Sequence, residues 1–310
     1  MAEQEKSCGS CEKESCSAKD QRPDESLEQF LERTELRRRM CRIGRKIIVL
    51  SGKGGVGKST VAVNLAVGLS LQGKAVGLLD ADIHGPSVPK LFALEKRRCE
   101  TQEGTLIPPV VGDLKLMSLG FLLGGGDDAV IWRGPMKMSA IKQLLKDTEW
   151  GDLDFLVVDC PPGTGDEPLS VVQLIEDVTG AVIVTTPQEV AILDVRRAIT
   201  FCRKLNVPVL GVIENMSGFT CPKCGTVVDI FKSGGGEKMA SEMGVPFLGR
   251  IPLDPQVAEA GDSGEPFVHL NSKTEAAKAF ARVVGTILNR TQTQQPRWTP
   301  ARNRTTIKEE

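Results

Sequence analysis

The sequence lacks a net charge of either sign, and it lacks any long apolar run. Its 310 residues include 39 Lys and Arg against 40 Asp and Glu, which gives a formal net charge of −1. Proteins that bind nucleic acid usually carry a basic surface, so this balance argues against a nucleic-acid partner. No stretch of 18 apolar residues is present, and no basic-then-apolar leader precedes a small-residue cleavage site. We therefore expect a cytoplasmic protein with no membrane partner.

Histidine is scarce, whereas cysteine is abundant for a cytoplasmic protein. The chain has two histidines, His84 and His269, and nine cysteines. An odd count in a chain long enough to bury a large core does not indicate a disulfide framework. The cysteines form three groups: isolated (Cys41, Cys99, Cys160, Cys202), clustered near the N-terminus (Cys8, Cys11, Cys16), and paired (Cys221, Cys224). We expect the isolated ones to be small, partly buried apolar side chains.

Three parts of the chain differ in composition. Residues 1–42 combine a polar, cysteine-containing tail, expected to be flexible, with an amphipathic helix read within 25–43. The apolar residues of that helix are Leu27, Phe30, Leu31 and Met40. Residues 291–310 have no apolar period and are expected to form a second flexible tail. One folded domain over 43–290 is therefore expected between them.

Apolar runs and helical patterns alternate through this domain, without an internal repeat. The expected strands are 46–52, 75–82, 114–120, 154–162, 180–187, 207–217 and 246–254. The expected helices are 58–73, 135–150, 189–206 and 273–290. Such alternation predicts an α/β fold with one doubly wound, mostly parallel sheet.

The first strand runs directly into a glycine-rich loop, GKGGVGKST, at residues 52–60. This segment fits the phosphate-loop pattern G-x-x-x-x-G-K-[ST], with a strand before it and a helix after it. Its glycines let backbone N–H groups turn toward phosphate oxygens, and the helix adds its positive end. Lys58 is expected at the β- and γ-phosphates and Ser59 on Mg²⁺. The predicted nucleotide-binding residues of the loop are Gly52, Lys53, Gly54, Gly55, Val56, Gly57, Lys58, Ser59 and Thr60.

A second lysine, Lys53, makes this loop resemble the deviant form found in MinD, ParA and the nitrogenase iron protein. In that class the extra lysine crosses a dimer interface and contacts the nucleotide of the partner, where a cation stabilises phosphoryl transfer. The resemblance implies a nucleotide-dependent homodimer and a P-loop NTPase fold. The alternative is a solvent-facing loop lysine.

Carboxylates follow two of the expected strands, where ligands bind in such sheets. Asp80 and Asp82 follow one strand, and Asp159 follows another. By resemblance, Asp82 belongs to the switch that positions or activates the attacking water, and Asp159 holds Mg²⁺ directly or through water. Residues 163–165 with Asp166 resemble a γ-phosphate-sensing switch, although Asp166 also fits a helix N-cap.

Two further residues are assigned to the nucleotide base by resemblance alone. Asn215 in IENMS would read the adenine amino edge, and Pro252 in RIPLD would lie near the base.

The pair Cys221 and Cys224, in CPKCG, is open to several interpretations. It is an idle reduced pair, a redox dithiol, half of a zinc site, or half of an iron–sulfur site. A structural zinc needs four ligands, and neither histidine has ligand spacing with the pair. A two-fold dimer would bring two such pairs together. Four thiolates would then hold an iron–sulfur cluster between the chains.

Six motifs in this order closely resemble the Mrp/ApbC-type iron–sulfur carrier ATPases, which include the cytosolic Nbp/Cfd-type scaffolds. They are GKGGVGKST, DADIHGPS, WRGPMK, VVDCPPGTGDE, ENMSGF followed by CPKCG, and LGRIPLD. The resemblance covers about residues 43 to 290. It implies a slow, dimeric ATPase that uses ATP and Mg²⁺, with Lys53, Lys58, Asp82 and Asp159 as catalytic residues. It also implies a labile 4Fe–4S cluster on Cys221 and Cys224, passed to apo iron–sulfur proteins; no motif indicates the cluster donor.

The N-terminal cysteines resemble a ferredoxin-like motif of some eukaryotic members, with one ligand missing and the last spacing altered. Cys8, Cys11 and Cys16 would hold a second cluster if another thiol completed the set. The alternatives are a flexible thiol-bearing tail, or a zinc site that joins Cys8 and Cys11 to the CPKCG pair.

Two other functions compete with the carrier. A positioning or partitioning ATPase of the MinD/ParA kind usually needs an amphipathic membrane helix or a basic DNA-binding face, and neither is present in the sequence. A reductase resembling the nitrogenase iron protein also bridges a cluster, but its cysteines are not a CxxC pair. A chelation-resistant, redox-cycling cluster would favour the reductase, and a labile cluster favours the carrier.

Overall fold

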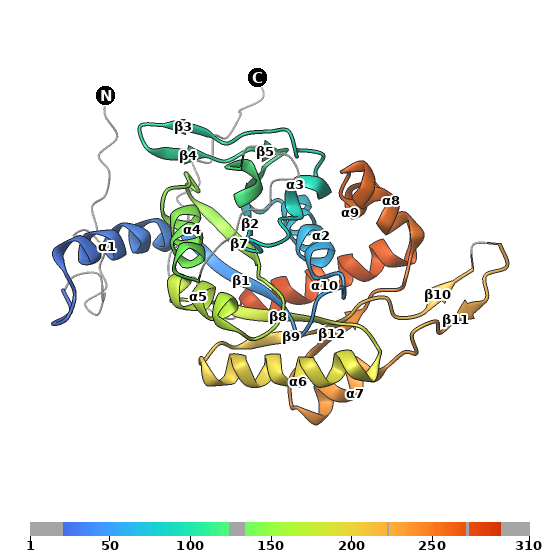
Figure 1. Cartoon of the computed structure of the whole chain (residues 1–310). Helices are drawn as coiled ribbons and strands as arrows, with labels where there is room; N and C mark the ends of the chain where they lie inside the picture. Colours follow the sequence, from blue (N-terminus) through green and yellow to red (C-terminus); the bar gives the residue numbers. More distant parts are fainter. Residues whose placement is uncertain (1–20, 124–133, 222, 271–272, 293–310) are drawn as a thin grey trace, which may run out of the picture.

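The computed structural model describes residues 21–123, 134–221, 223–270 and 273–292. Eight strands form one sheet in the order β12-β9-β8-β1-β7-β2-β6-β5 (Figure 1). Their bounds are β1 Ile43–Ser51, β2 Val76–Asp80, β5 Val110–Val111, β6 Leu114–Ser118, β7 Leu153–Asp159, β8 Gly180–Thr185, β9 Val209–Glu214 and β12 Phe247–Arg250. All neighbours are parallel except β5 and β6. The predicted doubly wound, mostly parallel sheet is confirmed.

Helices cover both faces of the sheet. On one side, α2 (Lys58–Leu71) packs against α10 (Glu275–Gln292) and the short α9 (Phe267–Leu270), and α3 (Val88–Leu91) packs against α8 (Pro255–Ser263). On the other, α4 (Gly134–Lys146) packs against α5 (Asp166–Ile175) and α6 (Glu189–Lys204) against α7 (Gly235–Glu242). The central strands are buried on both faces, which explains why they read as continuous apolar runs.

The N-terminal helix α1 (Leu27–Cys41) begins at a capping box formed by Ser26 and Gln29 and packs against α4. The predicted helix is therefore confirmed, but its inward face differs from the expected one. Leu36 and Met40 are buried, whereas Leu27 and Leu31 are exposed. The first turns of α1 extend past the helix that it packs on, so sequence periodicity overstated the buried stripe.

Two small hairpins were not predicted from the sequence. One joins β3 (Glu100–Gln102) to β4 (Thr105–Ile107), and the other joins β10 (Phe219–Thr220) to β11 (Val227–Val228). Strands of two or three residues are too short to show a period of two. The second hairpin projects outward from the rest of the molecule, at the right of Figure 1.

The direction of chain crossing reverses at β1. The chain passes from β1 through α2 to β2 on one side of β1, while β8, β9 and β12 lie on the other side. A ligand crevice forms at such a point, outside the carboxyl ends of the strands. The fold thus places the loop after β1 in the crevice. Of the described helices, none has the length and apolar character to cross a membrane.

Candidate functional site

The glycine-rich loop connects β1 to α2, as predicted, and its glycines are required by geometry. Gly57 is the N-cap of α2 with φ +79°, and a Cβ there would lie 2.3 Å from Asn215 Nδ2. At Gly52 a Cβ would lie 2.4 Å from the backbone of Asp194 in α6. The first and last glycines therefore let the loop pack between α6 and the segment after β9.

Replacing Gly57 with alanine is expected to destabilise the nucleotide-free protein by about 1–2 kcal/mol, because a left-handed backbone with a Cβ costs that much. The displaced Asn215 should also weaken ADP binding about tenfold or more. Gly54→Ala is the matched control, since a Cβ there meets nothing within 4 Å. Thermal unfolding and ADP titration measure both effects. Equal unfolding midpoints for the two variants would contradict the prediction.

A buried ion pair lies under the loop. Lys58 Nζ is 2.5 Å from Asp159 Oδ1, and the two side chains are 6% and 0% exposed. The other carboxylate oxygen, Asp159 Oδ2, is buried and has no hydrogen-bond partner in the described structure. Burial raises the pKa of the Asp159 carboxyl, against the lowering by Lys58 and by the Ser59 hydroxyl. The unpartnered oxygen beside a hydroxyl is a hard-oxygen donor set, which suits Mg²⁺.

Asp80 shapes the loop that carries Asp82. It lies at the end of β2, in register with Asp159 of β7. Its carboxylate accepts hydrogen bonds from the backbone N–H groups of Asp82 and Val88, both at 3.1 Å. Burial and the charge of Asp159 raise the pKa of Asp80 to about 7. The sequence placed Asp80 at this edge without assigning it a role; the structure identifies it as the anchor of residues 82–88.

A second cluster joins the loop after β2 to two helices. Lys137 Nζ of α4 lies 2.5 Å from Glu167 Oε1 of α5 and 2.5 Å from His84 Nε2. Partial burial raises the pKa of Glu167, but hydrogen bonds from Lys137 and His84 hold it below its ordinary value. The three residues come from separate segments, and no sequence spacing indicates that they meet. They tie the Asp82 loop to the start of α5.

Asp166 is exposed in the first turn of α5, and the N-cap of that helix is Gly165. The N-cap interpretation of Asp166 is therefore wrong: the chain becomes helical one residue earlier than a capping side chain requires. An acidic residue in the first turn still suits the helix dipole.

Of the two predicted base-reading residues, Asn215 contacts the phosphate loop, and Pro252 lies in a segment that pairs with the residues after Asn215. Asn215 is buried, and its Nδ2 donates to the carbonyl oxygen of Val56 at 2.9 Å. Pro252 is half-buried between β12 and α8. Its neighbours Ile251 and Leu253 pair with Ser217 and Gly218. Asn215 is thus in direct contact with the phosphate loop.

Cys221 and Cys224 lie at the tip of the projecting hairpin, half-buried and exposed respectively. The tip is closed by Gly225 N–H donating to Cys221 O, and by Cys221 N–H donating to Thr226 O, both at 2.9 Å. The Cys224 thiol lies 3.3 Å from Thr226 Oγ1, and that hydrogen bond lowers the pKa of Cys224. Among the described residues, no group of three or more His, Cys, Asp and Glu could hold a metal ion. The pair therefore finds no third ligand within the described part of its own chain.

The other cysteines differ from this pair. Cys160 and Cys202 are buried, and burial raises the pKa of Cys202 to about 12. Cys99 is half-buried, but Cys41 is exposed at the end of α1, so the apolar interpretation is wrong for Cys41. Cys8, Cys11 and Cys16, like Arg133 of WRGPMK, lie outside the described residues.

Two grooves adjoin the site. One, of about 530 Å³, is lined by Lys53, Gln188, Glu189, Val190, Ile230, Phe231 and Lys232. Lys232 pairs with Glu189 at 3.1 Å. This groove runs from the phosphate loop to the foot of the cysteine hairpin.

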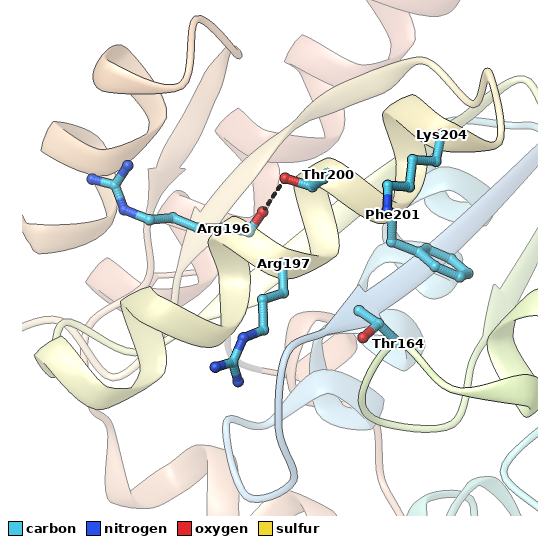
Figure 2. Close-up of a pocket in the computed structure, with 6 residues that line it drawn as sticks. All are labelled: Thr164, Arg196, Arg197, Thr200, Phe201 and Lys204. Carbon is cyan, nitrogen blue, oxygen red and sulfur yellow. Dashed lines mark hydrogen bonds between the residues drawn. The ribbon is translucent and has the colours of Figure 1, made fainter.

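The other groove, of about 410 Å³, lies between α6 and the turn before α5. Figure 2 shows Thr164 and Phe201 on the same side of α6, with the Arg196 side chain directed away from them. Arg196 pairs with Glu242, and Arg197 pairs with Asp194 at 3.0 Å. The two arginines of this groove are thus already paired with acids of the same chain, and we assign the groove no ligand.

The chain is similar to known proteins over most of its length. A family model described as NUBPL iron-transfer P-loop NTPase matches residues 42–288. The iron-sulfur cluster carrier protein of Methanocaldococcus jannaschii is 50% identical over 283 residues, covering 91% of this chain and 96% of that protein. The cytosolic Fe-S cluster assembly factor NUBP2 of Gallus gallus is 48% identical over 248 residues, covering 78% of this chain and 91% of that protein.

Solved structures agree with the fold. A nucleotide-binding protein from Archaeoglobus fulgidus, in complex with ADP, superimposes with a TM-score of 0.68 at 41% identity, covering 76% of this chain and 92% of that one. The cell-division ATPase MinD of Pyrococcus furiosus gives a TM-score of 0.58 at 24% identity, covering 79% of this chain and 99% of that one. The MinD likeness concerns the fold alone.

Proposed function

This chain belongs to the NUBPL iron-transfer P-loop NTPase family, and from that membership we propose that it is an iron–sulfur carrier that holds a labile 4Fe–4S cluster between two copies of itself. As a P-loop NTPase it is an ATP hydrolase. The observation that carries the proposal is the projecting hairpin with two thiols and no third ligand among the described residues of the chain. A cluster that asks for four thiolates obtains them from two such hairpins.

The hydrolytic residues act through an exchange of partners at Lys58. In the structure, the ammonium is held by Asp159. When phosphate enters the loop, Lys58 turns to it and leaves the Asp159 carboxylate. Asp159 and Ser59 are the residues that would then hold Mg²⁺. Mg²⁺ supplies charge neutralisation of the phosphates when bound. Asp82, on the loop held by Asp80, orients the attacking water.

A homodimer is supported by the surface around Lys53. No hydrogen-bond or ionic partner of the Lys53 side chain is found among the described residues, and it lines the groove that leads to the hairpin. The surface of α6 and of the hairpin region is apolar at Val190 (65% exposed), Leu193 (62%), Val227 (67%) and Ile230 (52%). Exposed apolar side chains around an unpaired cation suit burial against a second copy, with Lys53 reaching the nucleotide of the partner.

The cluster is cargo in this proposal. Apo iron–sulfur proteins are the acceptors, and a cytoplasmic location accords with the avian relative, which is named a cytosolic Fe-S cluster assembly factor. An exposed Cys224 with a lowered pKa favours the thiolate that binds iron and that exchanges it with an incoming thiol.

Anaerobic reconstitution with iron and sulfide tests the proposal. We expect about four irons and four sulfides per dimer, as a shared cluster requires. Size-exclusion chromatography with mass detection should show the dimer, and a chelator should remove the iron within minutes. Tightly held zinc in a monomer, with no uptake of iron, would refute the carrier function and leave the ATPase assignment intact.

A further inference from the structure

Glu214 is a fully buried carboxylate at the end of β9, and neither the nucleotide site nor the cysteine pair includes it. Its Oε1 accepts hydrogen bonds from Ser217 Oγ at 2.6 Å and from the Gly234 N–H at 2.8 Å. Its Oε2 accepts from the Gly236 N–H. Arg250 Nε lies 3.5 Å from Oε1 and supplies the nearby positive charge. A buried carboxylate with this many donors is held in one orientation.

These contacts join the two ends of the segment that contains the cysteine hairpin, from Ser217 to Gly234. Ser217 stands where the chain leaves the sheet toward the cysteine hairpin, and Gly234 stands where it returns to start α7. The same oxygen of Glu214 accepts from both. Gly236 completes the cradle, because a Cβ there would lie 2.9 Å from Glu214 Oε2. The foot of the hairpin is therefore fastened to a single side chain.

The next residue, Asn215, connects the end of β9 to the phosphate loop instead of to the hairpin. Its side chain donates to Val56 O of the phosphate loop and touches Gly57. Successive residues of an extended chain point in opposite directions. Two adjacent residues thus make the two connections: Asn215 contacts the phosphate loop, and Glu214 anchors the hairpin.

We infer that Glu214 is the positioning residue that couples the nucleotide state of the loop to the placement of Cys221 and Cys224. A phosphate that moves Val56 or draws Asn215 to the base shifts the end of β9. Glu214 then moves Ser217 and Gly234 together, so the hairpin moves as a unit. The relevance to cluster transfer rests on the proposed function, but the coupling itself concerns the chain without a bound cluster.

The test measures thiol reactivity in full-length protein that carries no iron–sulfur cluster. The rate at which iodoacetamide alkylates Cys221 and Cys224 is followed by peptide mass spectrometry, with and without Mg²⁺ and a non-hydrolysable ATP analogue. In the unsubstituted protein we expect the alkylation rate with the analogue and the rate without it to differ about fivefold or more. Fivefold is the lower end of ordinary coupling between two sites. In Glu214→Gln the ratio should fall to about one while the analogue still binds, because the amide nitrogen faces the Gly236 N–H as a second donor.

Glu237→Gln is the matched control. Glu237 is an exposed acid that also pairs with Arg250 but does not contact Ser217 or Gly234, so it should keep the ratio of the unsubstituted protein. A merely structural role of Glu214 would change both rates alike and leave their ratio unaltered. Either that result, or a ratio of one in the unsubstituted protein, would overturn the inference.

Ser217→Ala provides a second variant if Glu214→Gln does not fold. It removes one anchor and leaves the carboxylate paired with Gly234, Gly236 and Arg250. Its ratio should move toward one, and an unchanged ratio would contradict the coupling. Iron reconstitution of the unsubstituted protein is scored separately, so a failure of the carrier function is distinguishable from a failure of the coupling.

Discussion

Replacing Lys58 with alanine should lower ATP hydrolysis by at least about 10²–10³-fold, the usual loss when one preorganised donor to the developing charge is removed. The side chain is buried under the loop beside Asp159, so its removal takes the ammonium group out of the site. Phosphate release under saturating ATP and Mg²⁺ measures the loss. Hydrolysis at the unsubstituted rate would contradict the phosphate-loop assignment.

The same substitution should also cost stability, and the cost should depend on pH. Removing Lys58 leaves Asp159 buried without its cation, which for a buried pair costs about 3–5 kcal/mol. Burial already raises the pKa of Asp159, and loss of Lys58 raises it further. A carboxyl whose folded-state pKa is raised is stabilising below its unfolded pKa, and that contribution is lost as pH rises through the folded pKa. The variant should therefore be closest to the unsubstituted protein in acid and fall behind it progressively as the pH rises.

Lys53→Ala is the control for this pH effect. Lys53 lies in the same loop but does not contact Asp159. It should lower hydrolysis through the proposed dimer contact while leaving the unfolding midpoint and its pH dependence unchanged. Thermal unfolding of both variants from pH 5 to pH 8 separates the two roles. A parallel pH dependence for Lys58→Ala and the unsubstituted protein would show that Asp159 is not left uncompensated.

Replacing both Cys221 and Cys224 with alanine should abolish iron uptake on reconstitution, from about four irons per dimer to none, because each iron of the cluster requires its own thiolate. The fold and the nucleotide site should persist. Both residues lie in the turn of a projecting hairpin, Cys221 half-buried and Cys224 exposed, and substitutions at surface positions usually change stability by less than about 0.5 kcal/mol. Iron and sulfide assays, with ADP titration of the same samples, measure both expectations.

Cys99→Ala is the matched control, because Cys99 is a half-buried thiol beside the β3–β4 hairpin and should leave iron uptake unchanged. Normal iron content in the double variant would place the cluster elsewhere and refute the hairpin site. Each single variant should lose the cluster as well, because two thiolates per dimer would remain in place of four.

Much of the architecture followed from local pattern. The strands that flank β1 are buried at every position except Asp154 and are mostly apolar, so the parallel sheet was predictable without knowledge of contacts. The elements that were missed are short. The β10–β11 hairpin has two residues in each strand and exposes Val227 and Val228, so neither alternation nor burial marked it in the sequence.

The sequence by itself determined the phosphate loop and the cysteine pair, because their residues are adjacent and the backbone alone brings them together. Gly57, Lys58 and Ser59 are consecutive residues at the start of α2, so the local backbone alone places them side by side. Cys221 and Cys224 are close for the same reason.

Only the tertiary structure decided which distant groups act on these motifs. Lys137 meets His84 across 53 positions and Glu167 across 30, and Glu214 meets Gly234 across 20. Such contacts depend on how helices pack on the sheet and where the strands end, and no period in the sequence encodes them. Burial is decided in the same way. Nothing in the sequence distinguishes Asp80 and Glu214 from other acids, but both are buried at strand ends, where each holds a loop through hydrogen bonds to backbone N–H groups.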